Sequence, residues 1–312
     1  MTAVVTGDPV SNEPRQVAAA AVHRRRPFLT QARRRSLTGF LFVLPGVLPL
    51  CLFVIYPAFN SLLLSLTDWD LTGPPQFQGI QNYVDLAGNP QFIEVLLTTG
   101  KFALGVAVPA AVLAFVLAVL LDAGVRYTSW YQPLLFFPVV LPSVVSAILW
   151  AIMYQGDGVI NNLLGMKIGW LTDPTWALFS LVVLLIWTNL GYYTVIMLAG
   201  VRDVPREYYE AARTDGAGWA ALIRHITLPL VRPALLFILV IATADSLTLF
   251  AQPYLMTRGG PGDATRMISE LIYETAFNFT NIGKAAAMTF VLLVAALTVA
   301  AVQFRILRSS HE

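Results

Sequence analysis

Residues 103–121 read ALGVAVPAAVLAFVLAVLL, an apolar run of 19 residues that contains no charged side chain. An α-helix rises about 1.5 Å per residue, so a run of this length can cross the roughly 30 Å hydrocarbon core of a bilayer. Five other predominantly apolar runs of similar length lie elsewhere in the chain, at 39–59, 134–153, 176–200, 234–256 and 285–304. The sequence therefore predicts an all-α membrane protein with six transmembrane helices.

The amino-acid composition supports the same class of protein. Of 312 residues, 57% are hydrophobic and only 12% are charged, which is more apolar than one soluble core of this size requires. A soluble protein is excluded on this ground. The single cysteine, Cys51, lies within the first apolar run, so an intrachain disulfide and a metal site built from cysteines are excluded as well.

The basic residues are distributed unevenly, and this distribution predicts the orientation of the chain. If the N-terminus is cytoplasmic, 15 of the 20 Lys and Arg residues fall in cytoplasmic segments, and the other five lie outside or at the outer rim. Basic loops tend to remain on the cytoplasmic side of a membrane. With six spans, both termini are then expected in the cytoplasm.

The N-terminal segment differs from the rest of the chain. Residues 1–36 are polar and rich in Ala, Pro and Arg, and they lack the apolar core and cleavage site of a signal peptide. We expect them to form a disordered basic cytoplasmic tail, followed by a membrane domain at 37–308. The arginine triplets at 24–26 and 33–35 are interpreted as topology anchors, and a nucleic-acid partner is not expected.

The cytoplasmic loop at 202–233 is too long and too regularly patterned to be only a connection. Pro205 is typical of a helix start, and the residues from 205 to 214 predict a short helix. Gly216 follows at the position where a left-handed residue ends a helix, and a second short helix is expected at 219–225.

Two interpretations of this short helix remain open from the residues alone. It can be an amphipathic helix that lies at the lipid headgroups. It can instead be a docking element, because its alanines permit close backbone approach and Glu210 and Asp215 can face a basic groove on a partner.

A specific spacing within this loop resembles a known signature. Glu210-Ala211-Ala212, three residues, Gly216, nine residues and then 226–229 (ITLP) is similar to the cytoplasmic loop of binding-protein-dependent ABC importer permeases. The segments 77–83 and 257–261 resemble the sugar-permease branch of that family, which includes the maltose-type first permease and the glycerol-phosphate-type permease. The resemblance covers about residues 37–308, without the extra N-terminal spans of the maltose-type protein.

This resemblance implies a type I ABC importer permease fold, with a cytoplasmic coupling helix that docks on a separate ATPase. It implies a heterodimer with a second permease, two copies of the ATPase subunit, an extracytoplasmic solute-binding protein and a prokaryotic cytoplasmic membrane. The chain has no phosphate loop, so we expect no catalytic residue, metal site or cofactor in it, and ATP and Mg in the partner ATPase. The predicted ATPase-coupling residues are Glu210, Ala211, Ala212, Asp215 and Gly216.

The solute is expected to be a sugar or a sugar-like molecule such as an oligosaccharide, a polyol or a glycerol phosphate. Polar side chains within a bilayer are costly and therefore point to a cavity or a partner helix. Residue type alone selects Ser143, Asn189, Tyr192, Tyr193, Asp245, Ser246 and Gln252 as candidates for solute binding. Resemblance to the maltose-type permease also selects Ser143 and Ser246, and it adds Leu190, Gly191, Thr194 and Leu249.

Structural roles remain open for several of these residues. Ser143 and Ser146 can satisfy carbonyl groups that Pro138 and Pro142 leave free, and Asp245 can pair with a partner subunit. An ion-coupled secondary transporter that uses Asp245 is an alternative function. A membrane enzyme is disfavoured, because the three histidines are scattered and no serine-centred motif is present. Neither alternative explains the patterned loop.

Overall fold

The computed structural model describes residues 36, 40, 42–123 and 128–308. The expected tail therefore lies outside the described residues, except for Ser36. Contacts divide the chain into two units, 1–57 and 58–312, which are described separately. The first unit contains the beginning of the apolar helix Phe42–Leu64, including a π-helical turn, η1 (Cys51–Ile55). No described side chain of this unit is buried, and Cys51 is a free, exposed thiol.

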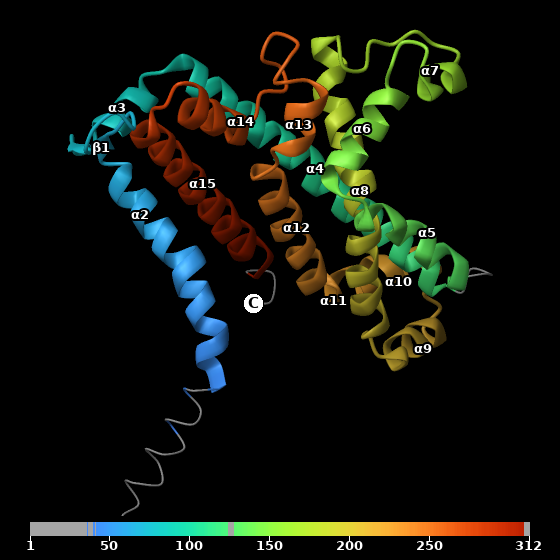
Figure 1. Cartoon of the computed structure of the whole chain (residues 1–312). Helices are drawn as coiled ribbons and strands as arrows, with labels where there is room; N and C mark the ends of the chain where they lie inside the picture. The colour runs from blue at the N-terminus through green and yellow to red at the C-terminus, as the bar shows by residue number, and fades with distance from the viewer. Residues whose placement is uncertain (1–35, 37–39, 41, 124–127, 309–312) are drawn as a thin grey trace, which may run out of the picture. The chain divides into compact units, whose positions relative to one another are not determined.

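The second unit is almost entirely helical. Its elements in chain order are the end of α2 (Tyr56–Leu64), β1 (Thr67–Asp68), β2 (Gln76–Phe77), α3 (Gln81–Ala87), α4 (Pro90–Asp122), α5 (Thr128–Val140), α6 (Ser143–Met153), α7 (Val159–Leu164), α8 (Pro174–Arg202), α9 (Arg206–Thr214), α10 (Trp219–Leu222), η2 (Ile223–Thr227), α11 (Leu228–Leu230), α12 (Arg232–Leu247), α13 (Ala251–Met256), α14 (Ile268–Tyr273), η3 (Glu274–Asn278) and α15 (Ile282–Arg308). Figure 1 labels most of them.

The core of this unit forms where α4 packs against α8 and α12. The buried face of α4 presents small side chains, including Ala107, Ala110, Ala114 and Ala118. Small residues let helix backbones approach closely in membranes, where apolar burial by itself does not drive helices together. The ring of Tyr193 on α8 is fully buried in the same cluster. This packing fixes the two helices that carry most of the predicted solute-binding residues.

The two longest helices of this unit, α4 and α8, are capped at their starts by side chains. The Asn89 side chain accepts hydrogen bonds from the backbone amides of Gln91 and Phe92, and Pro90 occupies the first position of α4. Asp173 accepts from the amide of Thr175 ahead of α8, whose first residue is also proline. These contacts satisfy donors that a helix N-terminus leaves free.

The predicted spans are present, but two of them are bent. Among the described residues, four helices are long and apolar enough to cross a membrane, and six spans result if each bent pair counts as one. The expected single helix at 134–153 is two helices, α5 and α6, and the chain bends by 106° between them, next to Pro142. The expected span at 234–256 ends at Leu247, and α12 instead forms a 65° bent pair with the preceding helices.

Short elements connect the spans at the end of the bundle opposite α9. The side chain of Asn82 donates hydrogen bonds to the carbonyl oxygens of Ser65 and Thr67, and so joins α3 to β1. The amide of Ile282, at the start of α15, donates to the carbonyl oxygen of Trp69. A Cβ atom at Gly283 would lie 2.0 Å from the carbonyl oxygen of Thr67, so only glycine permits this close approach.

Candidate functional site

The loop after α8 forms the helix that the sequence predicts. Glu207 lies in the first turn of α9 and Arg213 in the last, an arrangement that complements the helix dipole. Gly216 has φ +82° and follows the helix end. The amide of Gly216 donates to the carbonyl oxygen of Arg213, and the amide of Ala217 donates to that of Ala212. These two bonds form a Schellman motif, which ends α9 and turns the chain toward α10.

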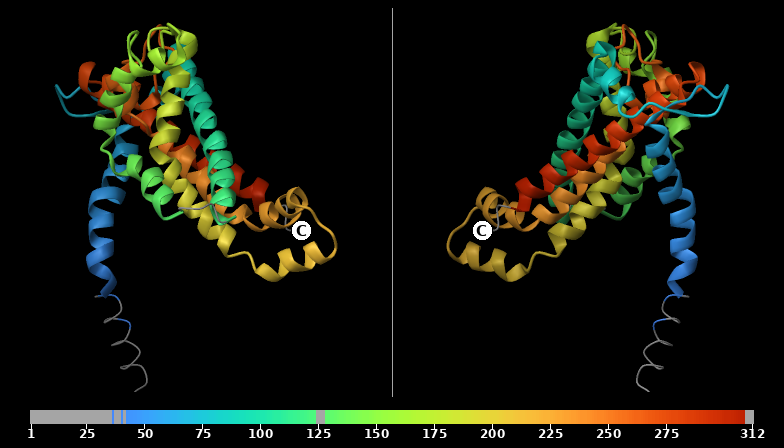
Figure 2. Two further views of the ribbon diagram at one scale, coloured as in Figure 1. Left: turned by 90° about the vertical axis from the view of Figure 1, so that its right-hand side faces the viewer. Right: turned by 90° about the vertical axis from the view of Figure 1, so that its left-hand side faces the viewer.

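The helix α9 is held by a contact on its inner side. The Tyr209 hydroxyl lies 3.0 Å from the Thr227 hydroxyl, and its half-buried ring packs against the core that contains Val204 and Val231. Thr227 itself is buried. Figure 2 shows α9 lying beyond the end of α8. This contact joins α9 to η2, which precedes α11 and α12 in the chain.

The outer side of α9 is accessible. Of the predicted coupling residues, Glu210, Ala211, Asp215 and Gly216 are exposed, and Ala212 is half-buried. A cavity of about 770 Å³ lies between α9, α10 and the ends of α4 and α8. The structure therefore places the predicted coupling residues together in α9 and the turn that ends it, and most of them are accessible.

A second group of polar residues lies within the spans. The Tyr193 hydroxyl on α8 donates to a carboxylate oxygen of Asp245 on α12 over 3.4 Å. Asp245 is exposed in the isolated chain although it lies inside a span. Because a carboxylate in contact with lipid is costly, this exposure points toward a polar pathway or a second subunit.

The predicted solute-binding residues differ in accessibility. Three are exposed (Ser143, Tyr192 and Asp245), three are half-buried (Asn189, Leu190 and Leu249), and five are buried (Gly191, Tyr193, Thr194, Ser246 and Gln252). Thr194 and Ser246 donate their hydroxyl protons to carbonyl oxygens one turn earlier in their own helices. The accessible members of the set are therefore the stronger candidates for contact with a solute.

Gly191 has a packing role in the structure. A Cβ atom at this position would lie 2.0 Å from the carbonyl oxygen of Leu135, so α5 approaches α8 directly at the glycine. Tyr209 holds α9 against η2 and was not selected from the sequence. A signal was present in the spacing, because Tyr209 and Ala212 are three residues apart and therefore lie on one face of the predicted helix.

Among the residues that the structure describes, no group of three or more His, Cys, Asp or Glu side chains is arranged to hold a metal ion. The features described so far define a multi-pass membrane protein that presents an exposed short helix, α9, at one end of its helix bundle. The sequence profile of the family described as "Binding-protein-dependent transport system inner membrane component" matches residues 102–310. The chain belongs to this family of transport permeases, which confirms the resemblance seen in the loop.

Individual relatives agree with this assignment. The chain is 34% identical over 272 residues to "Probable ABC transporter permease protein YesP" of Bacillus subtilis, with 84% of this chain and 87% of the relative covered. It is 33% identical over 286 residues to "Lactose transport system permease protein LacF" of Rhizobium radiobacter, with 87% and 94% covered.

A solved structure identifies the fold. The chain matches, with a TM-score of 0.77 and 23% identity, a subunit in the crystal structure of a bacterial ABC transporter involved in the import of the acidic polysaccharide alginate. The match covers 90% of this chain and 98% of that chain. The fold is therefore the type I ABC importer permease fold, as expected.

Proposed function

We propose that this protein is one membrane-spanning permease subunit of an ATP-driven importer that translocates a sugar or a sugar-like solute. The observation that carries the proposal is α9, an exposed short helix that is anchored through Tyr209 and ended by a left-handed Gly216. ATP and Mg act in a separate ATPase subunit, two copies of which dock on the coupling residues of the two permeases. Closure of the ATPase pair moves α9 as a rigid body and switches the spans between two states.

The proposed partners follow from the permease fold and from the exposure of residues that are expected to line the solute pathway. Asp245 and Tyr192 are exposed on the isolated chain, so a second permease is needed to enclose them. An extracytoplasmic binding protein delivers the solute. A match to a bacterial alginate transporter solved in complex with a periplasmic protein that carries an alginate pentasaccharide supports this arrangement by fold alone. The distribution of basic residues supports two cytoplasmic termini in a prokaryotic cytoplasmic membrane.

A sugar-like solute is supported by two features. The relative named above is a lactose transport permease, and it aligns along 87% of this chain. The exposed Tyr192 ring, the half-buried Asn189 amide and the exposed Asp245 carboxylate lie on α8 and α12. An aromatic ring can stack on the apolar face of a sugar, and amide and carboxylate groups can bind its hydroxyls.

The proposal is tested by purification of the tagged chain from its native membrane, with identification of the proteins that accompany it. We expect a second permease and an ATPase with a phosphate loop. Reconstitution of this complex with the binding protein should give solute uptake that requires ATP. The proposal would be contradicted if the chain is recovered alone and drives uptake from an ion gradient without ATP. That result would favour the ion-coupled secondary transporter.

Substitution of Asp245 by Asn tests the solute pathway. Loss of the charge should lower ATP-driven uptake by about 10- to 100-fold, because a hydrogen bond to a charged group is worth roughly 1.5–3 kcal/mol. Uptake by purified complex in vesicles, measured at several solute concentrations, gives this factor.

The matched control is Tyr193→Phe, which removes only the hydroxyl that contacts Asp245. Its hydrogen bond is long, at 3.4 Å, so uptake should change by less than about threefold. If Tyr193→Phe lowers uptake as much as Asp245→Asn, the carboxylate serves to join α8 to α12 and does not contact the solute.

A further inference from the structure

The carboxyl group of Glu270, in the short helix α14, is buried without a hydrogen-bond partner. The residue is 1% exposed, and both of its carboxyl oxygens lack a partner among the described residues. A buried unpaired carboxylate is strongly disfavoured, and such a group instead takes up a proton and becomes neutral. The helix α14, which carries Glu270, is not one of the candidate membrane spans and lies at the end of the bundle opposite α9 (Figure 1).

The loop before α14 covers this carboxyl group. A Cβ atom at Gly259, which has φ +77°, would lie 3.3 Å from a carboxyl oxygen of Glu270. The loop is closed on itself, because the hydroxyls of Thr257 and Thr265 lie 2.7 Å apart and Thr265 also donates to the carbonyl oxygen of Gly260. The backbone of this loop therefore separates Glu270 from water.

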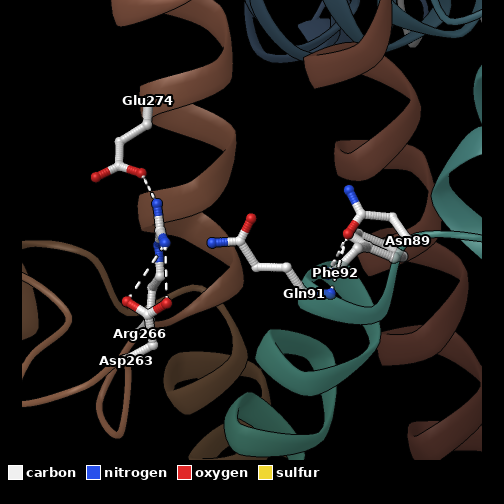
Figure 3. Close-up of polar contacts among 6 residues, drawn as sticks. All are labelled: Asn89, Gln91, Phe92, Asp263, Arg266 and Glu274. Atoms are coloured by element: carbon white, nitrogen blue, oxygen red, sulfur yellow. Dashed lines mark hydrogen bonds and ion pairs between the residues drawn. The ribbon is translucent and has the colours of Figure 1, made fainter.

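The guanidinium group of Arg266, which acts on Glu270 electrostatically, is paired with two other carboxylates. Arg266 forms ion pairs with Asp263, at 3.3 Å, and with Glu274, as Figure 3 shows. On the neighbouring helices, Glu94 and Lys101 of α4 are exposed, and Lys284 of α15 is half-buried. Burial raises the pKa of Glu270 to about 7, and the charges of Glu274 and Asp263 add to this rise. Arg266 opposes the rise, and so, to the smallest extent, does the backbone amide of Met267, which lies outside normal hydrogen-bond geometry.

The helix α14 is connected to the spans on both sides. The amide of Ile268 donates to the Thr99 hydroxyl of α4 over 3.0 Å. The Ser269 hydroxyl donates over 2.8 Å to the carbonyl oxygen of Leu249, in the break between α12 and α13. The Tyr273 ring lies 5.2 Å from the Phe250 ring in the same break. A displacement of α14 would therefore reach the end of α12, where Leu247 is only two residues from Asp245.

We propose that Glu270 is a proton-binding site that keeps the segment 257–281 closed against the spans while the proton is bound. Loss of the proton to water leaves a carboxylate beside Glu274 and Asp263, and this carboxylate becomes solvated only if the segment opens. In the orientation given under Proposed function, on which the functional part of this inference rests, the segment faces the extracytoplasmic side. The permease would then respond to the pH of that compartment.

The direction of the pH dependence follows from proton linkage. The carboxyl of an opened segment ionises near its ordinary pKa of 4.5, and the closed one ionises near pH 7. Between these values the open state binds fewer protons, so the closed state loses stability as pH rises across this window and changes no further above it. The opening equilibrium constant should increase by up to about tenfold per pH unit within the window.

Hydrogen–deuterium exchange of the full-length protein in lipid nanodiscs tests the proposal. Exchange of 257–281, corrected for the intrinsic rate at each pH, is compared between about pH 5 and about pH 8. In wild type, residues 257–281 should lose protection from exchange as the pH rises across this range. In Glu270→Gln, which has no titratable group at position 270, protection of the same residues should not change with pH. Glu270→Met offers a second non-titrating variant if the glutamine variant fails to fold.

Glu94→Gln is the matched control, because it removes an exposed carboxylate near the start of α4, the helix that α14 contacts through Thr99. Its profile should match that of wild type. Parallel profiles in wild type and Glu270→Gln would overturn the proposal, as would a wild-type segment that gains protection with rising pH. These outcomes do not depend on transport, so they separate failure of this inference from failure of the importer assignment.

Discussion

Substitution of Gly216 by Val should reduce solute uptake by about tenfold or more, although the chain still inserts into the membrane. Gly216 has φ +82°, and an L-residue in the left-handed region costs about 1–2 kcal/mol, with β-branched residues affected most. The turn after α9 would lose its Schellman bonds, and the coupling residues would no longer be presented to the ATPase in one geometry. ATP-driven uptake and recovery of the ATPase during purification measure the effect.

Gly218→Val is an unusually close control for this experiment. Neither glycine has an atom within 4 Å of the position that a Cβ would occupy, and the two residues differ mainly in backbone conformation, because Gly218 has φ −77°. Gly218→Val should therefore retain uptake near the wild-type level. If both variants lose uptake equally, the side-chain volume is responsible, and the left-handed turn does not explain the coupling role.

The parts of the fold that follow local rules could be predicted from the sequence. The apolar run at 103–121 lies within α4, and the helix predicted at 205–214 is α9, whose bounds are Arg206–Thr214. Gly216 was expected to be left-handed and has a positive φ. These features depend on hydropathy, helix propensity and capping, which are properties of neighbouring residues in the chain.

The bends could not be predicted in the same way. Pro142 marks a place where a helix can break, but the 106° angle between α5 and α6 depends on the helices against which each half packs. The end of α12 at Leu247 is still less apparent, because the residues that follow, Thr248 to Phe250, include no proline or glycine. Tertiary contacts determine where such helices break, and these contacts cannot be deduced from a single sequence.

The candidate sites also differ in whether they could be predicted from the local sequence. The predicted coupling residues lie close together in the sequence, so their spacing alone places them in one short element, which is exposed in the structure. The predicted solute-binding residues lie on α6, α8, α12 and α13 and between the last two, and their exposure depends on packing. The sequence alone does not distinguish Glu270 from other glutamates, because a single glutamate in a polar outer segment is common. Only the fold reveals that its carboxyl group is buried beneath Gly259.

Substitution of Gly191 by Ala should destabilise the protein strongly. The added Cβ would lie 2.0 Å from the backbone carbonyl oxygen of Leu135, and a backbone atom cannot move aside as the end of a flexible side chain can. The helix α5 would have to separate from α8, and overpacking of this kind typically costs about 1–3 kcal/mol or more. We expect a clearly lower thermal unfolding midpoint and less chain in the membrane.

Gly105→Ala provides the comparison, since it makes the same chemical change within a span. A Cβ at Gly105 would lie 3.5 Å from a methyl group of Val182, which is an ordinary contact, and alanine favours a helix by about 0.8–1.0 kcal/mol over glycine. This variant should be as stable as wild type or slightly more stable. If Gly191→Ala is equally stable and raises only the apparent KM for the solute, then Gly191 contacts the solute as its resemblance to the maltose-type permease implies. Loss of stability without such a rise assigns it to helix packing.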